Sequence, residues 1–282
     1  MPGDDALDHY ELGPGVHVFV PPAPRRYGDT NLGLVVDPDG LTIVDTLASP
    51  RRAHRAKHAI TELTAELELP IKRVVVSSSR VPFSGGSWAF WQSAFLGSEA
   101  TSDQLDEPAN LEALRRLLPE LADDYHEEFE TRPITHTVSE AVQLTDAIVG
   151  VPLPGESPTN LVTVIPGADV VFAGALASFG VTPLAFDGDP AAWADSLETL
   201  LELGTTIVPG HGQPGGAADV ADLVGYLRAC VEVDGDAGAL PTGPWDAWSD
   251  RRFDEVNVER AARLARGDGS TPEAMFRLLG FA

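Results

Sequence analysis

Two stretches of the chain carry side chains that could do chemistry on their own. His211 stands in the turn PGHGQPGG, and imidazole has the reference pKa nearest neutral, so His211 is a candidate general acid or base. The alternative is that Gly210 and Gly212 form a tight turn that packs His211 against its neighbours. Ser77 to Ser79 offer hydroxyls, but no Ser-x-x-Lys or Gly-x-Ser-x-Gly pattern accompanies them, which favours a solvated loop over a nucleophile.

Spacing alone gives little support for a metal site. His54 and His58 are four residues apart on a predicted helix, a spacing that can bind a metal, but this helix is expected in an outer layer. The chain has one cysteine, Cys230, which excludes an internal disulfide and a cysteine-based structural zinc site.

The net charge narrows the classes of partner. Acidic residues outnumber basic ones 43 to 19, which gives a formal charge of −24. Such a surface repels phosphate backbones and anionic lipids, so we expect neither a nucleic acid nor a membrane as partner. The acidic start MPGDDALDHYELGPG shows no signal peptide, and no apolar run is long enough to span a bilayer. A cytoplasmic protein is therefore expected, with a small-molecule metabolite as its partner.

The elements that would position these residues alternate between strands and helices. A strand at 16–20 is followed by apolar runs at 31–36 and 41–45, which a Pro/Asp/Gly turn joins into a hairpin. Ser49 and Pro50 begin a helix that runs to about Leu67. The β-branched run at 71–76 predicts a strand that is buried on both faces.

The second half repeats this alternation. Further expected elements are, in order, polar helices within 101–130, short strands within 134–151, a hairpin of 161–165 with 170–172, a helix from Asp189, a strand at 206–208 and helices from about 217. Two strand-rich blocks that are each followed by helices predict an α/β protein. We expect a four-layer αββα sandwich in a single domain over 1–282.

Four segments in this order resemble the metallo-β-lactamase superfamily. They are NLGLVVDPDGLTIVDT, VVVSSSRVPFSGG, PGESPTN with LVTVIPGADVVFAGAL, and VPGHGQPGG. The pieces FGVTPLAFDGDPAAWADSLETL and FDEVNVERAARLA resemble the zinc-hydrolase branch near glyoxalase II. The likeness covers roughly residues 14–265, and it implies the αββα fold.

The resemblance also locates the metal-ligand positions of the superfamily. In this chain those positions hold Ser78, Arg80, Pro82, Phe83, Glu156, Ala175 and His211, and only His211 keeps the family residue. A hydroxyl is a poor zinc ligand, and the fixed positive charge of Arg80 would face a dication. Glu156 and His211 belong to different halves of the two-metal site. We therefore expect a degenerate motif with no metal and no other cofactor.

The replacements suggest chemistry of their own. Arg80 and Glu156 stand at positions that share one metal ion in the family, so their side chains should lie within reach of each other. They could form an ion pair that fills the emptied cavity. Alternatively, the guanidinium could replace the metal and bind a carboxylate or polarise a carbonyl. Asp45 resembles the structural aspartate that supports the ligand loop of the family, and Ser78 is a candidate hydrogen-bond donor to ligand.

Two further groups are candidates for the pocket. The loop after the first strand carries Arg25, Arg26 and Tyr27, which could steer an anionic ligand, although solvated arginines are the commoner case. Trp88 and Trp91 could line the pocket, but we favour core packing for them. The candidate substrate-binding residues are therefore Ser78, Arg26, Tyr27 and Trp88.

Three functions remain open at this point. The first is a metal-independent enzyme that acts on a small anionic or carbonyl-containing metabolite through Arg80, Glu156 and His211. The second is a pseudoenzyme that binds a small molecule or a partner. The third is a hydrolase with an atypical metal site. Because proteins of this fold often form dimers, a homodimer is one expected assembly.

Overall fold

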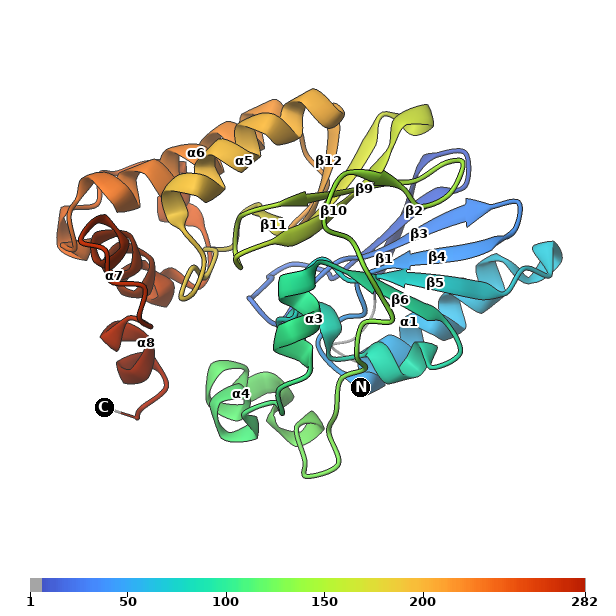
Figure 1. The fold of residues 1–282 in the computed structure, drawn as a ribbon, viewed down its shortest axis with the longest axis horizontal. Coiled ribbons are helices and arrows are strands. Elements are labelled where there is room, and N and C mark those ends of the chain that lie inside the picture. Colours follow the sequence, from blue (N-terminus) through green and yellow to red (C-terminus); the bar gives the residue numbers. More distant parts are fainter. Residues whose placement is uncertain (1–6, 282) are drawn as a thin grey trace.

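A computed structural model describes residues 7–281, whose strands form two sheets (Figure 1). The seven strands of the first sheet lie in chain order: β1 (Asp8–Gly13), β2 (Val16–Val20), β3 (Leu32–Asp37), β4 (Gly40–Val44), β5 (Ile71–Val75), β6 (Ala94–Gly97) and β7 (His136–Thr137). The first four strands pair antiparallel, whereas β4 to β7 run parallel. The expected hairpin is confirmed as β3 and β4.

The second sheet has five strands, in the spatial order β12-β11-β10-β9-β8. They are β8 (Val142–Gln143), β9 (Val149–Leu153), β10 (Asn160–Ile165), β11 (Val170–Ser178) and β12 (Thr206–His211). The predicted hairpin is β10 with β11, which runs six residues further than its expected end at Phe172. Parallel pairing of β11 with β12 carries the chain to His211 at one end of the sheet.

Helices cover the outer face of each sheet (Figure 1). The first sheet is covered by α1 (Pro50–Leu63), and the second by α5 (Pro190–Leu203) and α6 (Ala217–Glu232). One apolar core lies under α1, one between the two sheets, and one under α5 and α6. Three cores separate four layers, so the predicted αββα sandwich is confirmed.

Local sequence explains where two of these helices begin and end. The Ser49 side chain accepts a hydrogen bond from the backbone N–H of Arg52 at 3.4 Å, and Asp189 caps α5 in the same way. The first helix ends at Leu63, before the expected Leu67, because a 3-10 turn follows and Glu68 adopts a positive φ of 51°. The prediction was therefore correct at the start of the helix and wrong at its end.

Two predictions about burial were wrong. In β5 only Val74 and Val75 are buried, because the start of this strand reaches the surface. Trp88 and Trp91 are 46% and 59% exposed, so neither belongs to the core. Trp88 lies on a short 3-10 helix, and the guanidinium of Arg132 stacks on its ring instead.

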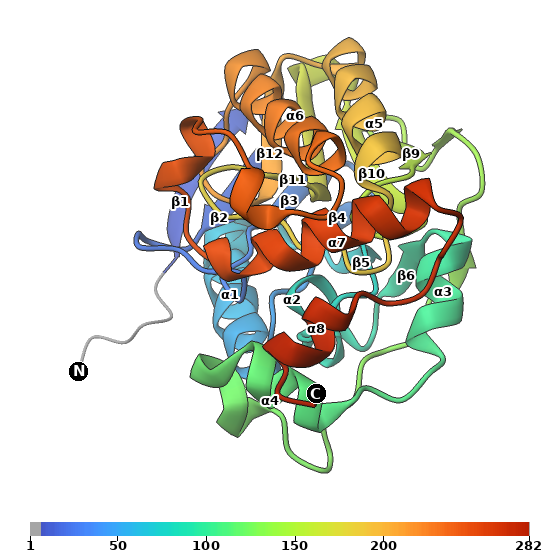
Figure 2. The same cartoon turned by 90° about the vertical axis from the view of Figure 1, so that its left-hand side faces the viewer.

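Five further α-helices complete the described part of the chain. They are α2 (Val81–Ser84), α3 (Glu99–Leu105), α4 (Leu111–Leu117), α7 (Asp254–Ala265) and α8 (Glu273–Leu278). Figure 2 shows α8 beside α4, where Leu117 and Met275 share one apolar cluster. The Arg116 guanidinium donates hydrogen bonds of 2.7 Å to the carbonyls of Leu279 and Gly280. No helix among residues 7–281 has the length and apolar content needed to cross a membrane.

Candidate functional site

The loop after β5 is held in place by hydrogen bonds to a buried aspartate, Asp45. One carboxylate oxygen of Asp45 accepts the backbone N–H of Ser77 at 2.8 Å, and the other accepts its hydroxyl at 2.9 Å. Gly174 packs against this pair with a φ of +52°, and a Cβ there would lie 2.3 Å from Ser77 Oγ. Burial raises the pKa of Asp45 to about 7. This contact sets the path of the chain into Ser78 and Arg80.

Arg80 and Glu156 meet as the sequence predicted. The Arg80 Nε lies 3.5 Å from Oε1 of Glu156, whose residue is 2% exposed. The Ser78 hydroxyl donates to Oε2 of Glu156 at 2.8 Å, and the Tyr27 hydroxyl donates to Oε1 at 3.4 Å. Glu156 is therefore held by one cation and two hydroxyls, which is the pairing that a buried carboxylate requires.

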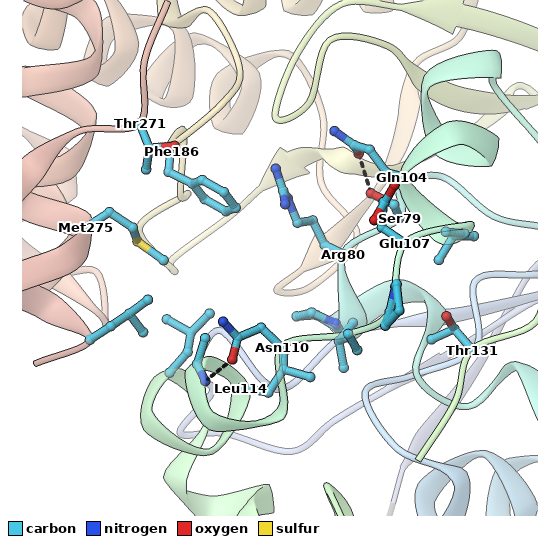
Figure 3. Close-up of a pocket in the computed structure, with 18 of the residues that line it drawn as sticks. Ser79, Arg80, Gln104, Glu107, Asn110, Leu114, Thr131, Phe186, Thr271 and Met275 are labelled. Carbon is cyan, nitrogen blue, oxygen red and sulfur yellow. Dashed lines mark hydrogen bonds between the residues drawn. The ribbon is translucent and has the colours of Figure 1, made fainter. Parts of the chain in front are cut away.

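A second carboxylate on Arg80 was missed by the sequence analysis. The Arg80 Nη2 forms an ion pair with Asp187, and the Gln104 Nε2 donates to the same carboxylate at 3.1 Å. The Phe186 ring lies 3.8 Å from the guanidinium carbon of Arg80 (Figure 3). Only the dipeptide Phe186-Asp187 in an irregular segment hinted at these contacts, because more than a hundred positions separate it from Arg80.

Burial and charge oppose each other in this network. Burial raises the pKa of Glu156 to about 7, Arg80 lowers it, and Asp187 raises it again. Burial also lowers the pKa of Arg80, but Asp187 and Glu156 outweigh this effect and leave it raised. The pKa of Tyr27 is well above its ordinary value because burial and Glu156 disfavour the phenolate. At neutral pH the site therefore holds a guanidinium, a neutral phenol and a carboxyl near its midpoint.

His211 lies in a different environment, among aromatic rings. Its ring stacks on Tyr27 at 5.1 Å and meets the edge of Phe83 at 5.3 Å. Its Nδ1 lies 3.3 Å from the carbonyl oxygen of Asp29, and the residue is 3% exposed. Burial lowers the pKa of His211 to about 4, so the imidazole is neutral at pH 7. Among the described residues, no hydrogen bond or ion pair joins His211 to Arg80 or Glu156.

A pocket of about 490 Å³ opens above Arg80 (Figure 3). Ser79, Arg80 and Gln104 give it a polar end, and α4 and α8 give it apolar walls. Among the described residues that line the pocket, Arg80 alone carries a positive charge, and Glu107 alone a negative one. The volume is in the range of pockets that hold small molecules.

The structure brings only two of the expected site residues into this pocket, Arg80 and Tyr27. Ser78 is fully buried behind Arg80, against Glu156. Arg26 is exposed on its loop, and Trp88 lies on the outer surface. Neither of these two residues lines the pocket.

Solved structures share this arrangement of sheets and helices. VMB-1, crystallised at pH 5.5, is 15% identical over 80% of this chain and 99% of its own, with a TM-score of 0.62. The metallo-β-lactamase FIM-1 from Pseudomonas aeruginosa, in its mono-zinc form, is 17% identical over 80% and 97%, with a TM-score of 0.61. A metallo-β-lactamase from Hirschia baltica is 17% identical over 79% and 97%, with a TM-score of 0.59. The chain has the metallo-β-lactamase fold. No family model and no curated protein sequence matches it.

The residues that the resemblance assigns to metal-ligand positions do not fit a metal ion. Arg80 and Glu156 are paired with each other, and Phe83 lies edge-on to His211. Two of the ligand positions, Pro82 and Ala175, offer no side-chain donor. Within residues 7–281, no three His, Cys, Asp or Glu side chains are grouped so that they could hold a metal.

Proposed function

We propose that the protein binds a small carbonyl-bearing molecule without a metal ion, with Arg80 as the hydrogen-bond donor to the carbonyl oxygen. One observation carries this proposal. The only cation among the described residues that line the pocket, Arg80, lies at the polar end of an otherwise mostly apolar cavity.

Arg80 keeps one nitrogen for a ligand. Its Nε and Nη2 are buried and face Glu156 and Asp187. Its Nη1 is not among the buried atoms, and it makes no hydrogen bond to any described residue. A guanidinium N–H donates well to an oxygen acceptor, and it polarises a carbonyl more strongly in a partly dry site.

Charge favours a neutral carbonyl over an anion. Two carboxylates already pair with the single guanidinium, and Glu107 adds a third acid at the pocket wall. The whole chain carries a formal charge of −24, which lowers the local concentration of anions. Of the two ligand classes expected from the sequence, the carbonyl compound is therefore the better fit.

Binding without turnover is the version that we favour, because Glu156 lies behind Arg80 and does not line the pocket. A catalytic version has one observation in its favour, the rise of the Glu156 pKa to about 7 beside a guanidinium. In that version Glu156 takes a proton from the carbon next to a carbonyl that Arg80 polarises, and then returns it. Exchange of this hydrogen for solvent deuterium, followed by NMR, separates the two versions.

The test is a thermal-shift and titration screen of carbonyl compounds, from short keto acids to amides and esters, in the presence of a chelator. Arg80→Met keeps much of the side-chain volume and removes the donor, so we expect it to lose the binding that the wild type shows. Arg26→Ala, on the exposed loop, is the matched control and should bind normally. Binding that requires added zinc, or that survives Arg80→Met, would overturn the proposal.

A further inference from the structure

The walls of the pocket indicate the chemistry of the part of the ligand that lies away from Arg80. The wall formed by α4, α8 and the residue after α8 is apolar and is made of Ala113, Leu114, Leu117, Met275, Phe276 and Leu279. Figure 3 shows Met275 on one side of the pocket and Gln104 and Glu107 on the other. A ligand that fills this space therefore meets hydrogen-bonding groups at one end and hydrocarbon along the rest.

We propose that the ligand is an uncharged, chain-like amphiphile with its carbonyl head on Arg80 and its hydrocarbon tail between α4 and α8. This inference rests on the proposed function. Three features of the described residues support this ligand class together. The free donor is a single guanidinium nitrogen, the charge around it is already balanced by acids, and the long wall offers only apolar contact.

The charge of the head group follows from the acids around Arg80. An ionised fatty acid would place a further carboxylate beside Asp187 and Glu156, with one guanidinium for all three. A primary amide presents the same carbonyl without the charge, and its N–H groups can donate to a carboxylate. Selection therefore runs against the acid and in favour of the neutral acyl derivative.

The tail wall is closed by the C-terminal end of the described chain. Arg116 of α4 holds the carbonyls of Leu279 and Gly280, and its guanidinium lies 4.6 Å from the ring centre of Phe281. Phe276 and Phe281 line the pocket and are still 44% and 43% exposed. A bound alkyl tail would cover part of these two rings. This would lower the free energy of the complex, because burial of apolar surface is favourable.

The experiment compares octanamide, butanamide and octanoate by titration at about pH 8, where the acid is ionised. Four additional methylenes that are buried on the wall should make octanamide bind at least roughly tenfold tighter than butanamide. Octanoate should bind at least roughly tenfold more weakly than octanamide, because of the acids on Arg80. Both results together support the proposal.

Ala113→Trp fills the tail wall and should abolish octanamide binding, whereas Ala218→Trp, on the exposed face of α6, is the matched control. Phe276→Ala serves if the tryptophan variant does not fold, because Phe276 is a half-exposed pocket residue. This variant should weaken octanamide more than butanamide.

Each contrary result has a separate meaning. Octanoate that binds as tightly as octanamide overturns the selection against charge, and butanamide that equals octanamide overturns the tail site. If neither amide binds while short carbonyl compounds bind in an Arg80-dependent way, this inference fails and the proposed function stands. If no carbonyl compound binds, both fail.

Discussion

The surroundings of Arg80 and of His211 differ in what fills them. On one side Arg80 and Glu156 keep a charged pair, add Asp187 as a further partner, and face a pocket. On the other side His211 is covered by Tyr27 and Phe83, and it is neutral at pH 7. The surroundings of Arg80 form a polar site at a cavity, whereas those of His211 belong to the packed interior.

This difference separates the residue that matches the resemblance, His211, from the residue that lines the cavity, Arg80. His211, which the resemblance marks as the retained family residue, is 3% exposed and does not line the cavity. The substituted position, Arg80, is the one that lines the cavity. A buried charge is retained only where partners balance it, so the surroundings of Arg80 keep their charges at a continuing desolvation cost.

The largest expected effect comes from Arg80→Ala. This change leaves Glu156 and Asp187 without their cation, so we expect ligand binding to be lost and the free energy of unfolding to fall by about 3 kcal/mol. The loss should be greater at pH 8 than at pH 5, because protonation of Glu156 relieves it. Chemical denaturation at the two pH values checks this, and an equal loss at both would contradict the charge balance.

Glu156→Gln should change how stability depends on pH. The folded-state pKa of Glu156 is raised to about 7 from its ordinary 4.5. Between these two values the folded protein binds more protons than the unfolded chain, so stability falls as the pH rises through this window. The variant should lose less stability than the wild type over this window, by on the order of 3 kcal/mol.

Two other acidic residues matter for this measurement of stability against pH. Asp45, whose pKa is also raised to about 7, contributes a fall of the same sign and remains in the variant. Glu107→Gln, on the exposed pocket rim, is the matched control for the removal of one carboxylate near the pocket. A Glu156→Gln variant with the slope of the wild type would show that Glu156 titrates normally in the folded protein.

His211→Phe should change stability only at low pH and should leave ligand binding intact. The pKa of His211 is lowered from 6.5 to about 4, so the unfolded chain binds a proton in this window that the folded protein does not. The wild type should therefore lose stability as the pH falls from 6.5 to 4, and the variant should lose less. The dissociation constant for octanamide, or for another ligand found in the screen, should stay within about twofold of the wild-type value. The phenylalanine ring fills most of the volume of the imidazole. A folded variant that loses binding would break the contrast between the surroundings of Arg80 and those of His211.

Trp88→Ala should have the smallest effect. Its side chain is largely exposed and contacts Arg132 outside the pocket, so we expect a change of about 0.5 kcal/mol or less in unfolding free energy. Ligand titration should match the wild type. Loss of ligand binding in this variant would place the ligand on the outer surface rather than over Arg80.

The four layers of the fold could be predicted from the sequence because strands, helix caps and turns depend on local residue patterns. Ser49 and Asp189 mark their helices by chemistry that needs only neighbouring residues. The approach of Arg80 to Glu156 was also predicted, because the resemblance assigns both residues to positions that share one metal ion. The closer likeness to glyoxalase II stays a prediction, because solved structures at this level of identity show the fold alone.

The pocket itself could not be predicted in this way. Its walls depend on the packing of α4 against α8, which pairs Leu117 with Met275 across more than a hundred positions. Asp187 reaches Arg80 from an irregular segment with no periodic signal. Tertiary packing decides such contacts, and a single sequence does not record it.

The central claim is that a guanidinium has replaced the metal. The most direct measurement is the zinc content of untagged protein after dialysis against zinc and then against metal-free buffer, by mass spectrometry. The account predicts less than about 0.1 equivalent, because Arg80 opposes a dication and no suitable ligand set is present among the described residues. One equivalent or more that survives dialysis would contradict it and return the protein to the metal-dependent hydrolases.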